Sequence, residues 1–488
     1  MKKGQVLQYM ENDVNNSFKS PFCSRYGSKE MLYIFSPNMK FKTWRKLWLA
    51  LAKAESELGL PISSSQLEEM EANIDIIDYD VAKKMEKSVK HDVMAHLFSY
   101  GRQCPNAAKI IHLGATSCYI TDNASIIIMR QGLRLIEKKL LEVLEILSRF
   151  AMKYKNLPCL SYTHLQPAQL TTVGKRATLW LQDFYMDYLD ISKLILNLKL
   201  LGSKGATGTQ ASFLELFENN EEKVELLEQK ILKEFDFKEA VYVSGQTYTR
   251  KLDFNICSAL CGVAQSAMKF SNDIRMLQNF KELEEPFEKN QIGSSAMPYK
   301  RNPMKSERVA ALSRYVIVNL LNPAFTAACQ YFERTLDDSA NRRIVIPEIF
   351  LSVDSILNIL LNICGGVVVN ENVIKNRVLK ELPFMATENI MMAAVKKGGN
   401  RQKIHEKLRV ICMQVSKNIA SGGENNLMQM LLEDGSFNLS KEEIQDILKP
   451  ENFIGLSSKQ VDRFLEKVIK PVTNGLKLSF SGNTELLV

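Results

Sequence analysis

Histidine is scarce in this chain, and cysteine is not arranged to bind a metal ion. The 488 residues include five histidines and nine cysteines, and no two cysteines form a C-x-x-C pair. His91 and His96 are five positions apart, which on a helix turns them about 140° from each other, unlike a metal-binding i, i+4 pair. We therefore predict no metal site. Cys257 and Cys261 have the spacing of one helix face, and we expect buried thiols in a reducing compartment.

Long apolar runs are also missing. No uncharged stretch approaches the roughly 18–20 residues that cross a bilayer, and the first residues lack the apolar core of a signal peptide. We expect a cytoplasmic protein with no membrane partner. Only 23 glycines and 14 prolines are present, which excludes collagen-like and low-complexity chains. Hydrophobic residues make up 45% and charged residues 24%, as in an ordinary globular protein.

The positive charge is modest for this length. A formal charge of +8 comes from 63 basic and 55 acidic residues, and the basic stretches are short. A nucleic-acid partner would require a concentrated basic stripe with interleaved aromatic residues, and the sequence has none. The excess charge fits either a solvated surface or attraction for an anionic small molecule.

Proline is absent from three long stretches, which leaves room for long helices. The stretches are residues 106–157, 168–285 and 384–449. In the first, apolar residues recur in alternating steps of three and four from Ile126 to Tyr154, as on a bundle helix, and Asp122 is a candidate N-cap. The same reasoning predicts further long helices over residues 172–201, 249–279, 304–321 and 349–363.

Strand signals are few, and the best of them, residues 241–243, is short. We therefore predict an all-α fold with three helical domains, of which the middle one is a central long-helix bundle. The predicted boundaries are residues 1–116, 117–369 and 370–488. Shorter helices are expected on both sides of the bundle.

Two polar segments hold residues suited to acid–base chemistry. His164, within S-Y-T-H-L-Q-P, is either a structural hydrogen-bonding residue or, because it titrates near neutral pH, a proton donor. Residues 291–303, Q-I-G-S-S-A-M-P-Y-K-R-N-P, cannot form a continuous helix because they include two prolines. This segment is either a mobile surface loop or a lid whose serines and cations close over a carboxylate-bearing substrate.

A third segment suits phosphate. Residues 332–343, F-E-R-T-L-D-D-S-A-N-R-R, include three arginines, whose guanidinium groups match phosphate oxygens. The alternative is a salt-bridged connection between helices. The glycines of residues 202–208 match neither a phosphate-binding loop nor a dinucleotide fingerprint. They predict a turn between helices, and no cofactor motif is found.

The loop G-S-S-A-M-P-Y-K-R-N-P resembles the fumarase/aspartase superfamily signature, G-S-x-x-M-x-x-K-x-N. Within that superfamily the chain resembles the adenylosuccinate lyases in their animal-type form. The further matching motifs are S-R-Y (24–26), H-D-V-M-A-H (91–96), H-L-G-A-T-S (112–117), T-H-L-Q-P-A-Q (163–169) and G-Q-T-Y-T-R (245–250). The resemblance implies β-elimination of fumarate from adenylosuccinate, giving AMP, and from the succinyl-aminoimidazole carboxamide ribotide of purine biosynthesis. It also implies purine nucleotide substrates, no cofactor, and a homotetramer whose active sites are each built from three subunits.

The same resemblance implies four catalytic residues. Ser294, or less plausibly its neighbour Ser295, would remove the proton from a carbon next to a carboxylate, where the developing negative charge must be stabilised. Lys300 would help to stabilise the serine oxyanion. His164 would protonate the leaving purine nitrogen, and Glu307 would pair with that histidine.

The substrate-binding positions also follow residue by residue from the resemblance. They are Arg25, Tyr26, Lys90, His91, Asp92, Thr116, Ser117, Thr163, Gln246, Asn302, Arg308, Arg334, Ser339 and Arg343. At position 90 related members often have arginine, and lysine keeps the charge without the two-donor geometry. Two alternatives remain: a sister lyase acting on argininosuccinate or malate, and a non-catalytic scaffold of the same fold. The arginine cluster and the histidine pair favour a phosphorylated substrate over the first alternative.

Overall fold

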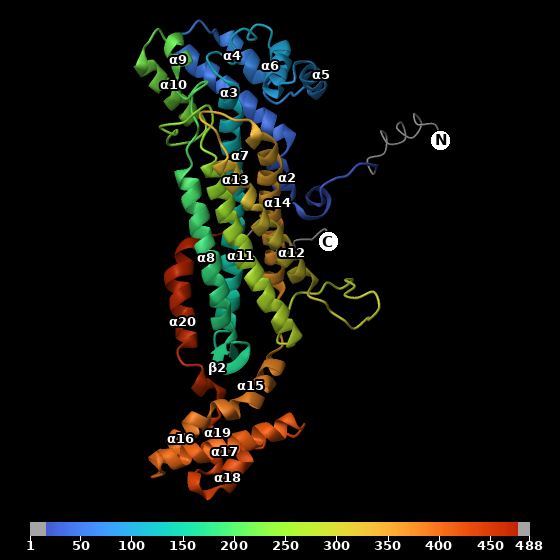
Figure 1. Ribbon diagram of the computed structural model, residues 1–488, viewed down its shortest axis with the longest axis vertical. Helices are drawn as coiled ribbons and strands as arrows, with labels where there is room; N and C mark the ends of the chain where they lie inside the picture. The colour runs from blue at the N-terminus through green and yellow to red at the C-terminus, as the bar shows by residue number, and fades with distance from the viewer. Residues whose placement is uncertain (1–15, 477–488) are drawn as a thin grey trace, which may run out of the picture.

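The computed structural model describes residues 16–476 and is all-α in architecture, as the sequence predicts (Figure 1). Five long helices lie together along the molecule. They are α7 (Ser117–Lys153), α8 (Val173–Asn197), α11 (Lys251–Asn279), α12 (Met304–Asn319) and α14 (Asp337–Gly366). Helix α7 packs against α8 and α14, and α11 packs against α8, α12 and α14. The apolar residues of the predicted seam, from Ile126 to Leu147, are buried in this core. Burial of this apolar face against the neighbouring helices stabilises α7.

The start of α7 differs from the sequence prediction. The helix begins at Ser117, with Thr116 as its N-cap residue, so Asp122 lies within the helix and is not its cap. Asp122 is 2% exposed, and its carboxylate accepts two hydrogen bonds from Arg250 at 2.8 and 3.2 Å. The prediction was wrong because an aspartate just before an apolar seam is typical of a helix cap. Here Asp122 instead pairs with Arg250, which is far away in the sequence.

Helix α14 also extends further than predicted, since it continues through Pro347 and begins at Asp337. Within residues 16–476, α14 alone is long and apolar enough to cross a membrane by length and composition. However, 78% of its most apolar window is buried inside the structure, where α7, α11 and α12 cover it. The apolar composition of α14 therefore serves the bundle core.

Shorter helices surround one end of the bundle (Figure 1). After the π-helical turn η2 (Phe22–Tyr26), the N-terminal ones are α2 (Lys29–Ile34), α3 (Pro37–Glu57), α4 (Ser64–Ala72), α5 (Tyr79–Val89) and α6 (Asp92–Gln103). The connections between the long helices contain α9 (Ala211–Leu216), α10 (Glu221–Glu234) and α13 (Leu321–Ala328). Helix α3 packs on α7 and on α10, so the N-terminal helices are attached directly to the bundle.

Strands occur in two small antiparallel sheets among the described residues. Strand β1 (Pro158–Thr163) pairs with β2 (Gln166–Thr172), and β3 (Leu283–Glu284) pairs with β4 (Val368–Val369). The prediction of a strand at residues 241–243 was wrong. That segment is an irregular loop, which follows an isolated β-bridge between Leu200 and Ala240. The segment around His164, expected as a polar loop, is instead the hairpin β1–β2.

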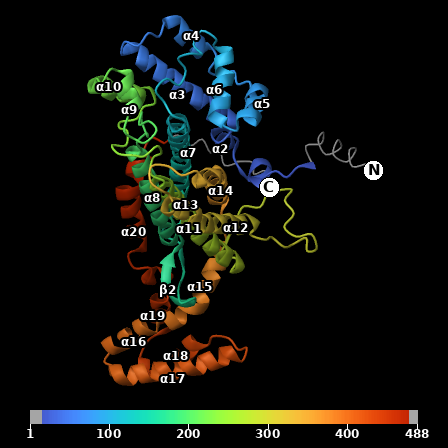
Figure 2. The ribbon, with the colours of Figure 1, turned by 45° about the horizontal axis from the view of Figure 1, so that its top comes forward.

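The C-terminal part of the chain divides into two packing regions (Figure 2). One region has its own core and consists of α15 (Glu371–Met385), α16 (Thr387–Lys396), α17 (Arg401–Ala420), α18 (Leu427–Glu433), η3 (Gly435–Phe437), α19 (Lys441–Ile447) and η4 (Pro450–Phe453). The other region returns along the bundle as α20 (Ser457–Phe464), η5 (Leu465–Ile469) and α21 (Lys470–Thr473). Val461 and Leu465 belong to the bundle core. The structure thus places the last described helices on the bundle, whereas the sequence prediction grouped them with residues 370–488.

Candidate active site

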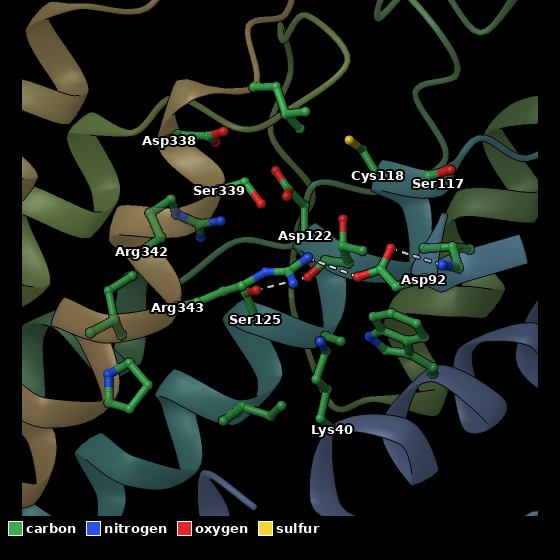
Figure 3. A pocket seen from close by; sticks show the side chains of 18 of the residues that line it. Lys40, Asp92, Ser117, Cys118, Asp122, Ser125, Asp338, Ser339, Arg342 and Arg343 are labelled. Carbon is green, nitrogen blue, oxygen red and sulfur yellow. Dashed lines mark hydrogen bonds and ion pairs between the residues drawn. The ribbon is translucent and has the colours of Figure 1, made fainter. Parts of the chain in front are cut away.

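A cavity of about 730 Å³ opens between α3, α6, α7 and α14 (Figure 3). It gathers eight of the predicted substrate-binding residues, which are Lys90, His91, Asp92, Ser117, Gln246, Arg334, Ser339 and Arg343. They come from four separate parts of the chain, because the start of α6, the start of α7, the loop before α11 and the start of α14 meet at this end of the bundle. The volume is that of a site for a small organic molecule.

The floor of the cavity is a buried network of charges. Arg250 is 2% exposed and donates to both Asp122, on α7, and Asp338, on α14, the latter at 2.7 Å. Arg334 donates to the other oxygen of Asp338 at 2.9 Å. Burial alone would raise the pKa of Asp338, but the charges of Arg250 and Arg334 outweigh it and hold this pKa below its usual value. Asp338 therefore stays ionised, and Arg250, at the start of α11, joins that helix to α7 and α14.

The walls of the cavity carry cations that can face an anion. Arg343 is exposed and donates to Asp92 at 2.8 Å (Figure 3), so one guanidinium edge is held in place from across the cavity. Lys40, from α3, also lines this wall, and burial together with the charge of Arg343 lowers its pKa. The Nε2 atom of His91 lies 3.3 Å from the hydroxyl of Ser117. Anionic groups entering here would meet fixed donors from three helices.

Several cavity residues were missed by the sequence analysis. They are Lys40, Cys118, Asp122, Arg250, Asp338 and Arg342. Arg250 ends the quoted motif G-Q-T-Y-T-R and Arg342 belongs to the arginine cluster, so a signal existed for these two. Lys40 lies in a helix without any distinguishing pattern, and only the fold brings it to the cavity.

The predicted catalytic histidine lies away from this cavity, at the tip of the β1–β2 hairpin. The strands pair up to Thr163 and Gln166, so His164 and Leu165 form a two-residue turn, with φ angles of 53° and 59°. Such turns favour asparagine and glycine, and each other residue in this left-handed region costs about 1 kcal/mol. Strain of this kind is typical of functional sites, and the histidine side chain is exposed at the tip.

The signature loop, defined here as residues 286–303, projects sideways from the bundle between β3 and α12 (Figures 1 and 2). It carries Ser294, Lys300 and Asn302, and Glu307 and Arg308 follow in the first turns of α12. The Ser294 hydroxyl accepts hydrogen bonds from the backbone N–H groups of Met297 at 3.1 Å and Ala296 at 3.4 Å. Lys300 and Glu307 are exposed.

The base of the signature loop is tied to the bundle. The buried Lys305 ammonium donates to the backbone oxygen of Pro286 at 3.0 Å and to the Asn362 side chain at 2.8 Å. The Glu285 carboxylate accepts from the N–H groups of Lys305 and Ser306, each at 2.9 Å, and so caps α12. The two ends of the loop are therefore held together while its middle extends into solvent.

Within the loop, the Asn302 side chain donates a hydrogen bond to the backbone oxygen of Gly293 at 2.7 Å. This bond holds the two halves of the loop close together. A Cβ atom at Gly293 would lie 2.2 Å from the backbone oxygen of Lys300. We therefore expect Gly293→Ala to push the loop apart and to lower kcat by about tenfold or more, while the thermal unfolding midpoint hardly changes. Steady-state kinetics and circular dichroism would test this. A variant with normal kcat would show that the close approach is not needed for turnover.

The predicted site residues therefore fall in four places in one chain. Eight line the cavity, and Thr116 caps α7 beside it. Thr163 and His164 lie at the hairpin, and five residues belong to the signature loop and α12. Arg25 and Tyr26 lie in η2, which packs against α14. Helices α3 and α6, which contribute to the cavity, lie at one end of the bundle and strand β2 of the hairpin at the other, while the signature loop projects sideways between them (Figure 1).

His96 and His112 are structural. His96 stacks on Phe41 with ring centroids 3.6 Å apart, and burial followed by the charge of Lys40 lowers its pKa to about 4. His112 accepts from the Trp48 indole at 2.9 Å, and burial lowers its pKa to about 4 as well. Among residues 16–476, no group of three or more His, Cys, Asp and Glu side chains is placed to hold a metal ion.

The sequence was compared with family models, curated proteins and solved structures, and the family models and the curated relatives agree. The family model described as Lyase matches residues 50–318, and the one described as Adenylosuccinate lyase C-terminus matches residues 383–464. The adenylosuccinate lyase of Saccharomyces cerevisiae is 49% identical over 456 residues, which cover 93% of this chain and 95% of the relative. The adenylosuccinate lyase of Schistosoma mansoni is 41% identical, covering 98% of this chain and 100% of the relative. Among solved structures, 3-carboxy-cis,cis-muconate lactonizing enzyme from Pseudomonas putida has a TM-score of 0.79 at 23% identity, covering 93% and 99% of the two chains.

Proposed function

Because the chain belongs to the adenylosuccinate lyase family of the fumarase/aspartase superfamily, we propose that it cleaves adenylosuccinate to AMP and fumarate. We extend the proposal to release of fumarate from the succinyl-aminoimidazole carboxamide ribotide. The resemblance inferred from the motifs is confirmed, and so is the prediction of a fumarate-releasing lyase. The observation that carries the substrate proposal is the cavity, which gathers eight predicted substrate-binding residues around a cationic wall.

Ser294 is proposed as the base of the β-elimination. It takes the proton from the substrate carbon next to a carboxylate, and the electron pair left on that carbon then expels the purine nitrogen and forms the fumarate double bond. A serine oxyanion is costly unless donors face it. Two backbone N–H groups already point at the Ser294 oxygen, which favours Ser294 over Ser295, and Lys300 would add a positive charge when the loop closes.

His164 is proposed as the acid that protonates the departing nitrogen, with Glu307 holding the imidazole in the required tautomer. The exposed tip of the hairpin suits this role because it can reach into a site formed with other chains. Thr163, on the hairpin, and Asn302, in the signature loop, would bind the succinyl carboxylates. Thr116, beside the cavity, and Ser117, in its lining, would bind them too.

The remaining binding residues are proposed to hold the nucleotide. Arg334, Ser339 and Arg343 would bind the phosphate from α14 and the loop before it, while Lys90, His91 and Asp92 approach from the opposite wall. Gln246 lies beside Cys118, whose thiol donates to its side-chain oxygen at 3.3 Å. Arg25, Tyr26 and Arg308 would complete the site from elements outside this cavity.

A homotetramer with sites shared by three chains is part of the proposal, and the spread of the site residues over separate regions supports it. Exposed apolar side chains on the long helices support it too, since patches of this kind mark interfaces. Examples are Met186 (58% exposed) and Leu196 (67%) on α8, and Val318 (66%) on α12. A cytoplasmic location also remains a proposal, and the nine unpaired cysteines fit it.

The test is a spectrophotometric assay of the purified chain with adenylosuccinate, argininosuccinate and malate in parallel. We expect turnover with adenylosuccinate alone, because the cavity places at least two arginines where a phosphate would bind. Good turnover of either other compound, without cleavage of adenylosuccinate, would contradict the proposal. No turnover of any of the three would favour a non-catalytic scaffold.

A further inference from the structure

The His164 hairpin cannot hold its own position. A two-stranded hairpin is marginally stable by itself, and this one ends in two left-handed residues that are neither glycine nor asparagine. A shift in register between Leu160 and Tyr162 further interrupts the pairing of β1 with β2. The place of the histidine therefore depends on what the two strands of the hairpin contact.

The hairpin is anchored close to its tip by Tyr162, two residues before the histidine. The Tyr162 hydroxyl accepts a hydrogen bond from the Nη2 atom of Arg377, on α15, at 3.0 Å. Its ring packs against Phe280, with centroids 5.5 Å apart, and the Arg377 guanidinium lies over the same Phe280 ring at 4.5 Å. The neighbouring Leu160 and Leu170 are buried against Val378 and Leu382 of α15.

Arg377 is in turn fixed by Glu282. Its Nε atom donates to the Oε1 atom of Glu282 at 2.7 Å, and the Glu282 side chain is 1% exposed. The other carboxylate oxygen has no hydrogen-bond partner among the described residues. Arg176, on α8, lies 4.0 Å from that oxygen and also donates to the backbone oxygen of Leu160 in β1. A buried carboxylate with so few partners requires the neighbouring guanidinium groups to remain charged.

We propose that Tyr162, Arg377 and Glu282 are positioning residues for His164. The inference rests on the proposed role of this histidine as the acid. The three side chains come from the hairpin, the first helix of the C-terminal region and the turn after α11, so they lock the hairpin to two elements at once. None of the three lines the cavity described above. Arg377, on α15, would therefore influence the reaction only through the position of His164.

The test compares Arg377→Gln, Arg377→Lys and Tyr162→Phe with the matched control Arg409→Gln. Arg409 is an exposed arginine of the same C-terminal region, also paired with a glutamate. We expect Arg377→Gln to lower kcat by about tenfold and Tyr162→Phe by about threefold, with KM for adenylosuccinate within about twofold of wild type. Arg377→Lys should recover part of kcat because it restores the charge beside Glu282. The control should behave as wild type.

A normal kcat for Arg377→Gln would overturn the inference, provided that the wild type is active and His164→Ala is not. The inference would also fail if kcat and KM worsened together, or if Arg377→Lys recovered nothing. If Arg377→Gln does not fold, Tyr162→Phe decides, since it removes one hydroxyl and keeps the ring. An inactive wild type would instead contradict the proposed function and would be recognised from the assay with adenylosuccinate.

Discussion

His164→Ala and Ser294→Ala are each expected to lower kcat for adenylosuccinate by about 10³-fold or more. Removing a general acid or base forfeits about 10²–10⁴ in rate, and the serine is proposed to start the elimination that the histidine completes. Both side chains lie on exposed segments, the hairpin tip and the signature loop, so neither substitution opens the core. Steady-state kinetics, with circular dichroism and light scattering as controls of fold and assembly, measures the effect.

Mixing the two inactive variants provides a sharper version of this experiment. The hairpin and the signature loop of one chain project in different directions (Figures 1 and 2), so a shared site would combine the histidine of one chain with the serine of another. After subunit exchange we expect part of the turnover to return, because some sites receive both intact residues. If native mass spectrometry of differently tagged variants shows mixed assemblies and activity stays absent, the two residues do not come from different chains. Near-normal kcat in either single variant would contradict its assigned role.

The long helices were the most predictable part of the fold. A seam such as Ile126–Leu147 repeats over many turns, and burial of one helical face is decided by local spacing. Boundaries were less predictable, because they depend on partners far away in the chain. Asp122 was read as a cap, although Arg250 pairs with it across 128 positions. The helix predicted over residues 349–363 is part of a longer one, because the packed core keeps α14 continuous from Asp337 through Pro347.

The site was predictable only as separate motifs. Each motif could be read locally, but their meeting at one cavity follows from the order of the helices in space. The hairpin was missed because its turn, His164–Leu165, has none of the asparagine or glycine that predicts a two-residue turn. Arg377 and Glu282 carry no local signal, since a single arginine on an amphipathic helix is usually a solvated surface residue. Lys40 was missed for the same reason.

Arg250→Met is expected to lower the free energy of unfolding by about 3–5 kcal/mol. The substitution keeps much of the side-chain volume but removes the charge that bridges Asp122 and Asp338, which are 2% and 1% exposed. Removing one partner of a buried ion pair leaves an uncompensated charge, which costs far more than breaking a surface pair. Urea unfolding at a fixed protein concentration measures the loss. The matched control is Arg149→Met, which breaks an exposed pair with Glu145 and should cost less than about 1 kcal/mol.

The effect of pH separates this electrostatic cause from simple loss of packing. The Asp338 pKa is depressed in the folded protein, so its contribution is fully present above the unfolded-state value of about 3.9 and is lost as the pH falls through the folded value. In Arg250→Met only Arg334 still lowers the Asp338 pKa, so this contribution is reduced and Asp338 takes up a proton more readily. The difference in stability between wild type and variant should therefore be largest near neutral pH and shrink as the pH falls below about 4. A second substitution, Asp122→Asn, should restore part of the lost stability, because Asp122 loses its ion pair in Arg250→Met whereas Asp338 keeps Arg334. A difference that stayed constant with pH and did not respond to Asp122→Asn would show that Arg250 acts through packing and not through these ion pairs.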